Sequence, residues 1–202
     1  MKTFTKAIAS GVMISIGATI YLSCENKIVG SVLFSIALFF ICSFGMNLFT
    51  GKIGYALQNR NNPNCLIIWL GNFVGCAGCA ALMRIAKPQL AEKAKALMEV
   101  KLQNSWLSIA ILSVFCGILM YIAVENFASN PSPAGKIVGI FLCICTFILS
   151  GFEHSIADIG YAAFAVSGIA QAGRFMIFLI VVSVFNGVCS ILFHTLHTYN
   201  KK

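Results

Sequence analysis

The segment from Gly151 to Ser155, which reads Gly-Phe-Glu-His-Ser, places an acid and a histidine inside a long apolar run. Ionisable side chains are costly to bury in a bilayer, and those that occur there usually mark a transport path or a proton relay. His154 is therefore the first candidate functional residue. The alternative is structural, because an intramembrane histidine can simply hydrogen-bond a neighbouring helix. We expect the adjacent Glu153 to be structural, accepting backbone N–H bonds that fix the chain at this point.

Cysteines are the second group of reactive side chains, and the chain has nine of them. Cys76 and Cys79 have the spacing of a redox or metal-binding pair, but no second pair and no nearby histidine completes a site. In apolar runs cysteine behaves as a small hydrophobe, and small residues let membrane helices approach closely. We therefore expect packing roles, with no metal and no cofactor. The alternative is a membrane redox or metal protein in which His194 or His197 joins the cysteine pair.

The composition indicates the class of protein. The chain is 59% hydrophobic and 10% charged, and its mean hydropathy is +0.89. Soluble domains average roughly 25% charged residues, so we expect an integral membrane protein and not an enzyme. The net charge of +8 comes from basic residues at the chain ends and between apolar runs, where such side chains reach lipid headgroups. No aromatic-interleaved basic motif accompanies them, so we expect no nucleic-acid partner.

Six apolar runs are candidates for membrane-spanning helices, each of which needs about 20 residues. They cover residues 7–24, 28–44, 66–85, 105–124, 137–151 and 175–194. The second and fifth runs are short and lead into polar, glycine-containing segments at 45–52 and 151–158. Non-helical backbone at membrane depth persists only where protein or a watery cavity surrounds it. We therefore expect an all-α membrane fold whose second and fifth helices are broken.

Polar residues near these breaks are expected to be structural. Asn47 lies in the first break, and Asp158 follows the second. Asp158 is predicted either to pair with Lys52 or to cap the helix that follows it. Between the third and fourth spans, residues 88–101 are predicted to form an amphipathic helix or loop on the membrane surface.

The two interruptions recur at a fixed spacing. Gly45 and Gly151 lie 106 residues apart, and so do the Ile-Gly-Tyr strings that follow them. Paired interruptions in two halves of a chain are the best sequence indication of a transport site. We therefore expect two three-span repeats, at about 1–100 and 101–202, and the odd number of spans makes the second repeat inverted. The alternative is a coincidence in a chain rich in glycine and isoleucine.

Four strings, in order along the chain, resemble motifs of the formate/nitrite transporter family. They are residues 6–17, 48–51, 71–75 and 151–157. This resemblance implies an aquaporin-like six-helix pore in a single domain over residues 1–202, assembled as a homopentamer. It also implies a multi-pass protein of the inner (plasma) membrane with both termini in the cytoplasm. Basic residues are divided evenly between the two sides, so the positive-inside rule does not decide this orientation.

The same resemblance implies roles for individual side chains. Thr50 matches the threonine of the break in the second helix, and His154 matches the central histidine. Lys101 matches a lysine ahead of the fourth span, which draws anions to the entrance. Each has a simpler explanation, because threonine also caps broken helices and Lys101 is one of several lysines in a polar segment.

Hydrophobic constrictions of the path are also implied by the resemblance. Phe34 and Leu38 match the constriction on one side of a small central chamber, and Phe147 matches the constriction on the other side. By default, phenylalanines in such a chain are core residues.

Some positions depart from the family pattern. Gly117 replaces the usual asparagine of the fourth helix, and Met120 replaces a small valine. Asp158 stands where asparagine is usual. We expect Gly117 to widen the path and the flexible side chain of Met120 to refill it, so these departures concern substrate choice and gating.

The expected function is transport of a small monovalent anion or its weak acid, with formate as the first choice and nitrite or hydrosulfide as alternatives. Moving a carboxylate-sized ion into a low dielectric costs on the order of 20 kcal/mol in the ideal limit and several in practice. Protonating a carboxylate of pKa about 4 at pH 7 costs only about 4 kcal/mol. We therefore expect transport linked to protons, with His154 or water in contact with it supplying the proton. A non-transporting sensor or scaffold is a further alternative.

Overall fold

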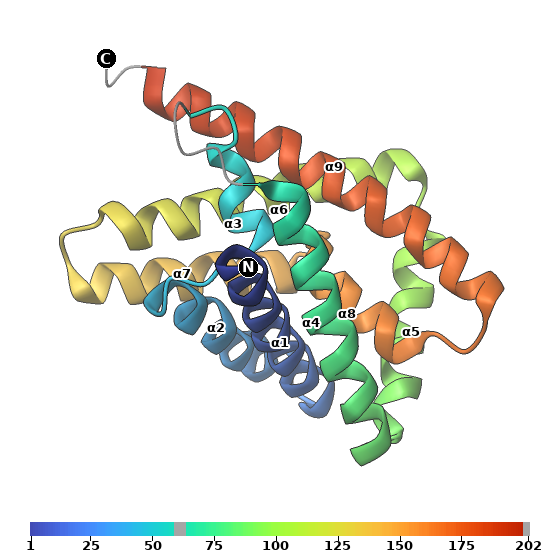
Figure 1. Ribbon diagram of the computed structural model, residues 1–202. Coiled ribbons are helices and arrows are strands. Elements are labelled where there is room, and N and C mark those ends of the chain that lie inside the picture. Colours follow the sequence, from blue (N-terminus) through green and yellow to red (C-terminus); the bar gives the residue numbers. More distant parts are fainter. Residues whose placement is uncertain (59–63, 200–202) are drawn as a thin grey trace.

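The computed structural model describes residues 1–58 and 64–199 and is built of helices, as predicted (Figure 1). In chain order these are α1 (Lys2–Ser23), α2 (Lys27–Ser43), α3 (Phe49–Lys52), the 3₁₀ turn η1 (Ile53–Tyr55), α4 (Cys65–Ala86), α5 (Gln89–Gln103), α6 (Trp106–Ser129), α7 (Pro133–Leu149), α8 (Ser155–Ala165) and α9 (Ile169–Tyr199).

Four helices, α1, α4, α6 and α9, are long and apolar enough to cross a membrane, and α2 and α7 are shorter apolar helices. Together they account for the six predicted runs. The helices extend beyond the predicted spans, most clearly α9, which covers Ile169–Tyr199 where 175–194 was predicted. Hydropathy detects only the part of a helix that suits hydrocarbon, whereas the hydrogen-bonded helix continues through polar ends such as Arg174 and His197.

Two breaks interrupt the apolar helices where the sequence predicted them, but they are shorter than predicted. α2 and α7 end just before Gly45 and Gly151, whose φ angles are +58° and +68°. This left-handed conformation suits glycine and ends helices. Helix then resumes at Phe49 and at Ser155, so the interruptions comprise only residues 44–48 and 150–154. The predicted extents, 45–52 and 151–158, are wrong at their C-terminal ends.

Helix pairs in the two halves of the chain approach each other at glycines. α1 packs on α4 and α2, and α6 packs on α9 and α7. A Cβ added to Gly11 of α1 would lie 2.2 Å from the carbonyl oxygen of Asn72 in α4. A Cβ added to Gly117 of α6 would lie 2.4 Å from the carbonyl oxygen of Asn186 in α9. Backbone therefore packs directly against backbone at both crossings, as small residues allow in membrane helices.

The predicted surface segment at 88–101 is helical. It forms α5, whose buried side chains Leu90, Ala94 and Met98 recur every four residues and so lie on one face. This face packs against α8. Because Lys101 is in the last turn of α5, the packing brings a lysine to the start of α8.

Candidate functional site

Thr50 and His154 meet in the interior, between the two helix breaks. Thr50 belongs to α3, and His154 is the residue immediately before α8. Thr50 Oγ1 and His154 Nε2 are 2.8 Å apart, and the side chains are 0% and 2% exposed. The structure therefore brings together the threonine and the histidine that the family resemblance singled out.

The other ring nitrogen of His154 holds the start of α8. Nδ1 accepts a hydrogen bond from the Ala157 backbone N–H at 3.0 Å, so His154 is the N-cap of this helix. An accepting Nδ1 carries no proton, so a neutral ring carries its proton on Nε2. Nε2–H therefore donates to Thr50 Oγ1, and the Thr50 hydroxyl proton is free to bond a second group.

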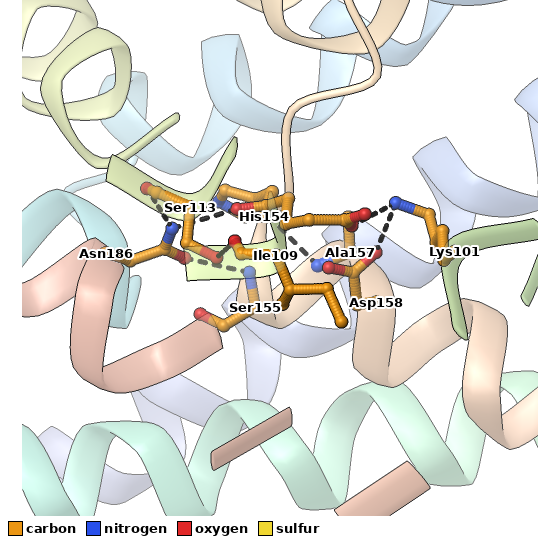
Figure 2. A network of polar contacts seen from close by, with 9 residues as sticks. Lys101, Ile109, Ser113, His154, Ser155, Ala157, Asp158 and Asn186 are labelled. Carbon is orange, nitrogen blue, oxygen red and sulfur yellow. Dashed lines mark hydrogen bonds and ion pairs between the residues drawn. The ribbon is translucent and has the colours of Figure 1, made fainter. Parts of the chain in front are cut away.

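A buried ion cluster lies beside His154, and Figure 2 shows Lys101 reaching toward its acidic partners. Lys101 Nζ forms an ion pair with Glu153 and a second with Asp158 at 3.0 Å. The lysine side chain is 12% exposed and each carboxylate side chain is 1% exposed. One lysine thus faces two carboxylates. The prediction that Asp158 pairs with Lys52 is wrong, because the packing of α5 on α8 supplies Lys101 instead.

Two asparagines hold the breaks, and the sequence reasoning gave them no role. Asn186 Oδ1 accepts from the Ser155 N–H at 2.9 Å, and its Nδ2 donates to the carbonyls of Glu153 and Ser113, both at 2.8 Å (Figure 2). It therefore satisfies backbone groups that the break leaves without helical partners. The Glu153 side chain, predicted to accept loop N–H groups, instead accepts from Lys101.

Asn72 makes the equivalent contacts at the first break. Its Oδ1 accepts from the Phe49 N–H at 2.8 Å, and its Nδ2 donates to the carbonyls of Asn47 at 2.8 Å and Ala7 at 2.7 Å. Asn47 also donates from its own side chain to the Thr3 carbonyl at 3.2 Å, which ties this break to α1. The sequence signal for both residues was an asparagine within an apolar run, at 66–85 and 175–194.

The aromatic residues predicted as constrictions contact one another. The ring centroids of Phe34 and Phe147 are 6.2 Å apart in an edge-to-face arrangement, and Phe147 stacks on the His154 ring at 5.4 Å. Phe34, Leu38 and Phe147 are at most 3% exposed. The expectation that Phe34 and Phe147 lie on opposite sides of a chamber is therefore wrong, because α2 packs directly on α7 and brings the two rings into contact.

Cavities lie on both sides of the Thr50–His154 pair. One, of about 300 Å³, is lined by Lys101, Glu153 and Asp158 and reaches His154 and Phe147. The other, of about 140 Å³, is lined by Lys52 and Gly45 and reaches Leu48, which directly precedes α3. One cavity thus borders His154 itself, and the other borders residues that flank Thr50 in the chain.

Gly117 and Met120 lie where helix packing explains them. Any side chain at Gly117 would collide with the backbone of α9, and its carbonyl accepts from Ser190 Oγ at 2.8 Å. The close approach of α6 and α9 alone requires glycine here. This is contrary to the expectation that Gly117 widens the path. Met120 is 1% exposed in the core of the molecule.

The cysteine pair and the C-terminal histidines do not converge. The Cys76 thiol donates to the Gly11 carbonyl at 3.1 Å and packs in the core. His194 and His197 instead contact the Tyr121 hydroxyl through Nδ1, at 3.0 and 2.9 Å. Within residues 1–58 and 64–199, no group of three or more His, Cys, Asp and Glu side chains is placed to hold a metal. His194 and His197 therefore do not complete a metal site with the cysteine pair in this part of the chain.

Known proteins share both the sequence pattern and the fold. The chain is 25% identical over 190 residues to formate channel FocB of Escherichia coli K12, covering 83% of this chain and 67% of that one. It is 26% identical over 182 residues to formate channel FocA of the same strain, covering 78% and 64%. The chain thus spans about two thirds of the length of these curated relatives.

Solved structures of channels have the same fold as this chain. A pentameric formate channel with formate bound superposes with a TM-score of 0.86 at 23% identity, covering 99% of this chain and 96% of that one. A channel described as an FNT family ion channel gives a TM-score of 0.80 at 21% identity, covering 99% and 88%. The formate/nitrite transporter family model matches residues 1–200. The chain is therefore an integral membrane protein that belongs to the formate/nitrite transporter family.

Proposed function

We propose that this protein transports a small monovalent anion or its weak acid, formate first, along a path that crosses the Thr50–His154 pair. The carrying observation is the buried 2.8 Å contact between Thr50 Oγ1 and His154 Nε2, which lies between two cavities. The Thr50 hydroxyl and the His154 Nε2–H are both donors, so together they offer two hydrogen bonds to the oxygens of a carboxylate. A permeant anion then replaces the contact that the two side chains make with each other.

The proposed transport is linked to protons. A bare carboxylate pays several kcal/mol to enter the apolar contact of Phe34 and Phe147, whereas protonation at pH 7 costs about 4 kcal/mol. A neutral His154 cannot give up its Nε2 proton unless Nδ1 takes another, and Nδ1 is occupied by the Ala157 N–H. We therefore assign the proton to water that reaches the site from a cavity. His154 holds the anion in place while that proton arrives.

The proposed architecture is a single pore domain over residues 1–202, made of six spans in two inverted repeats with an aquaporin-like arrangement. The matching contacts of Asn72 and Asn186 support it, since their partners at the breaks are 106 residues apart. The likeness to a pentameric formate channel supports a homopentamer with one path in each subunit. We place the protein in the inner (plasma) membrane with both termini in the cytoplasm.

Flux into proteoliposomes tests this function. Purified protein is reconstituted around a pH-sensitive dye, and formate, nitrite, hydrosulfide and lactate are added at pH 5.5 and at pH 7.5. We expect formate entry to acidify the lumen, and to be about 100-fold faster at pH 5.5 at equal total formate, because the protonated fraction rises tenfold per pH unit. Protein-free liposomes correct for acid that crosses the lipid directly.

Two substitutions of His154 separate its roles. His154→Phe removes every donor, so we expect it to abolish protein-dependent uptake. His154→Gln keeps one N–H donor without a titratable ring, so we expect it to retain slow, proton-linked uptake. If His154→Phe transports formate with the wild-type rate and pH profile, the proposed path is wrong. If none of the four acids enters faster than in empty liposomes, the proposed function is wrong.

A further inference from the structure

The smaller cavity contains a lysine without an acidic partner. This cavity of about 140 Å³ is lined by Gly45, Lys52 and Leu48 among other residues, and its lining includes no acid. Lys52 is half-buried in the last turn of α3. Within the described residues, no carboxylate oxygen lies within ion-pair distance of its Nζ. A lysine in such a position leaves its positive charge uncompensated by the protein.

Two more lysines lie against residues that line the same cavity. Lys6 Nζ donates to the Gly45 carbonyl at 3.2 Å, and Lys136 Nζ lies 5.6 Å from the ring centroid of Phe127. Both Gly45 and Phe127 belong to the cavity lining. The combined field of three lysines at one end of the path is positive, and a cleft with low-dielectric walls concentrates such a field.

Glu125 is the acidic residue closest in sequence to the residues that line the Lys52 cavity, but its carboxylate contacts another group. Glu125 follows the lining residue Val124, but its carboxylate accepts from the Tyr55 hydroxyl at 2.7 Å. It lines a separate cavity together with Tyr121 and His197. Glu125 therefore has its own hydrogen-bond donor and does not pair with Lys52.

The larger cavity, next to His154, contains a lysine that does have acidic partners. Lys101 faces two buried carboxylates, Glu153 and Asp158. The positive charge of Lys101 is therefore compensated by acidic side chains of the protein, in contrast to that of Lys52. Lys52 and Asp158 stand 106 residues apart, at equivalent positions after the two breaks. Among the described residues, the equivalent positions thus carry an unpaired lysine at one end and an acid paired with Lys101 at the other.

We propose that Lys52 is the capture site for the transported anion, and that small monovalent anions are held at the Lys52 end of the path and not at the Lys101 end. This inference rests on the proposed function, because it concerns the substrate of that same path. The cavity is several times the roughly 30 Å³ that a water molecule occupies, so an anion of three heavy atoms fits beside the ammonium group with water. Leu48 and Gly51, which line this cavity, lie within two residues of Thr50 in the chain.

Initial rates of labelled formate uptake, measured from each side, test the inference. Proteoliposomes are sorted by orientation with a one-sided affinity tag, and wild type is compared with Lys52→Gln, Lys52→Arg and Lys2→Gln. Lys2→Gln makes the same charge change at an exposed position near the same break, since Asn47 bonds the Thr3 carbonyl. We expect Lys52→Gln to raise the half-saturating formate concentration on the order of 10-fold from the Lys52 side. We expect no change from the Lys101 side or in the maximal rate.

The control variants decide between the outcomes. Lys52→Arg keeps the charge and is expected to behave as wild type, as is Lys2→Gln. If Lys52→Gln and Lys2→Gln give the same half-saturating concentrations from both sides, while wild type transports formate, Lys52 is not the capture site and the proposed function stands. A gel-filtration profile that matches wild type shows that Lys52→Gln is folded.

A binding measurement separates the inference from the proposed function. The ¹³C linewidth of labelled formate is recorded with protein in nanodiscs, where bound formate broadens the signal. We expect broadening by wild type and Lys2→Gln, and its loss in Lys52→Gln. Broadening that depends on Lys52 in a protein that transports no formate would leave the binding site standing and refute the transport function. Broadening that is unaffected by Lys52→Gln, or absent in wild type, would refute the capture site.

Discussion

Asn72 and Asn186 bind the two helix breaks through the same three contacts, to Ala7, Asn47 and Phe49 in one case and to Ser113, Glu153 and Ser155 in the other. Each partner of Asn186 lies 106 residues after the corresponding partner of Asn72. Each amide bridges a neighbouring helix to the C-terminal end of a break and the start of the helix that follows it. The positions of Thr50 and His154 therefore depend on these two asparagines.

The first prediction concerns this dependence. Asn186→Ala removes three hydrogen bonds to buried backbone groups. We therefore expect the free energy of unfolding to fall by at least about 3 kcal/mol, taking about 1 kcal/mol for each bond. Unfolding in dodecyl sulfate, followed by circular dichroism, measures it. Asn104→Ala, at an exposed asparagine at the end of α5, is the control and is expected to change stability by less than about 0.5 kcal/mol. Equal effects of the two substitutions would contradict the prediction.

Glycine at the α6–α9 crossing gives the second prediction. Gly117→Ala would place a Cβ 2.4 Å from a backbone oxygen, so we expect destabilisation by about 1–3 kcal/mol. Gly78→Ala is the matched control, because its Cβ would meet nothing within 4 Å. It is expected to be neutral, or stabilising by up to about 1 kcal/mol. A slower flux at unchanged stability in Gly117→Ala would instead indicate that Gly117 sets the width of the path.

The third prediction tests the Thr50 hydroxyl. Thr50→Val keeps the shape of the side chain and removes the donor, whereas Thr50→Ser keeps the hydroxyl. A hydrogen bond to a charged group contributes about 1.5–3 kcal/mol, so we expect Thr50→Val to slow formate uptake roughly 10- to 100-fold. Thr50→Ser is expected to stay within a few-fold of wild type. Similar uptake rates for the valine and serine variants would show that the hydroxyl does not bind the permeant.

The ion cluster at Lys101 gives the fourth prediction. Lys101→Met leaves two buried carboxylates without a cation, and breaking a buried pair in this way costs about 3–5 kcal/mol. Thermal unfolding in detergent measures the loss, and Lys93→Met, at an exposed lysine of the same helix, is the control. Adding Asp158→Asn to Lys101→Met is expected to recover part of the stability. A Lys101→Met protein as stable as the control would mean that the cluster is not held together by charge.

The family resemblance matched Thr50 and His154 to residues of the path. Hydropathy and a constant spacing predicted the helices and the two breaks, because both patterns reflect repeated local structure. They did not predict the partner of Asp158. Lys52 was the predicted partner, but the contact is decided by how α5 packs on α8. This packing involves the buried face of Leu90, Ala94 and Met98. A charged residue in an apolar run indicates that it needs a partner of opposite charge. Which residue becomes that partner depends on the tertiary packing.

Gly117 illustrates the same limit. Its departure from the family pattern suggested a wider path, because sequence shows which side chain is missing and not what fills its place. The structure fills it with the backbone of α9. Likewise, the contact between Phe34 and Phe147 depends on the distance between α2 and α7, which no spacing along the chain encodes.

The contacts of the two asparagines have a consequence for how the protein is made. Asn72 and all three of its partners lie in the first hundred residues, and Asn186 and its partners all lie in the second hundred. Each half can therefore fix its own break as it leaves the ribosome, without waiting for the other. The Thr50–His154 contact joins residues 104 positions apart, so it forms only when the finished halves associate in the bilayer. Two halves produced as separate polypeptides would carry the information needed to reassemble the site.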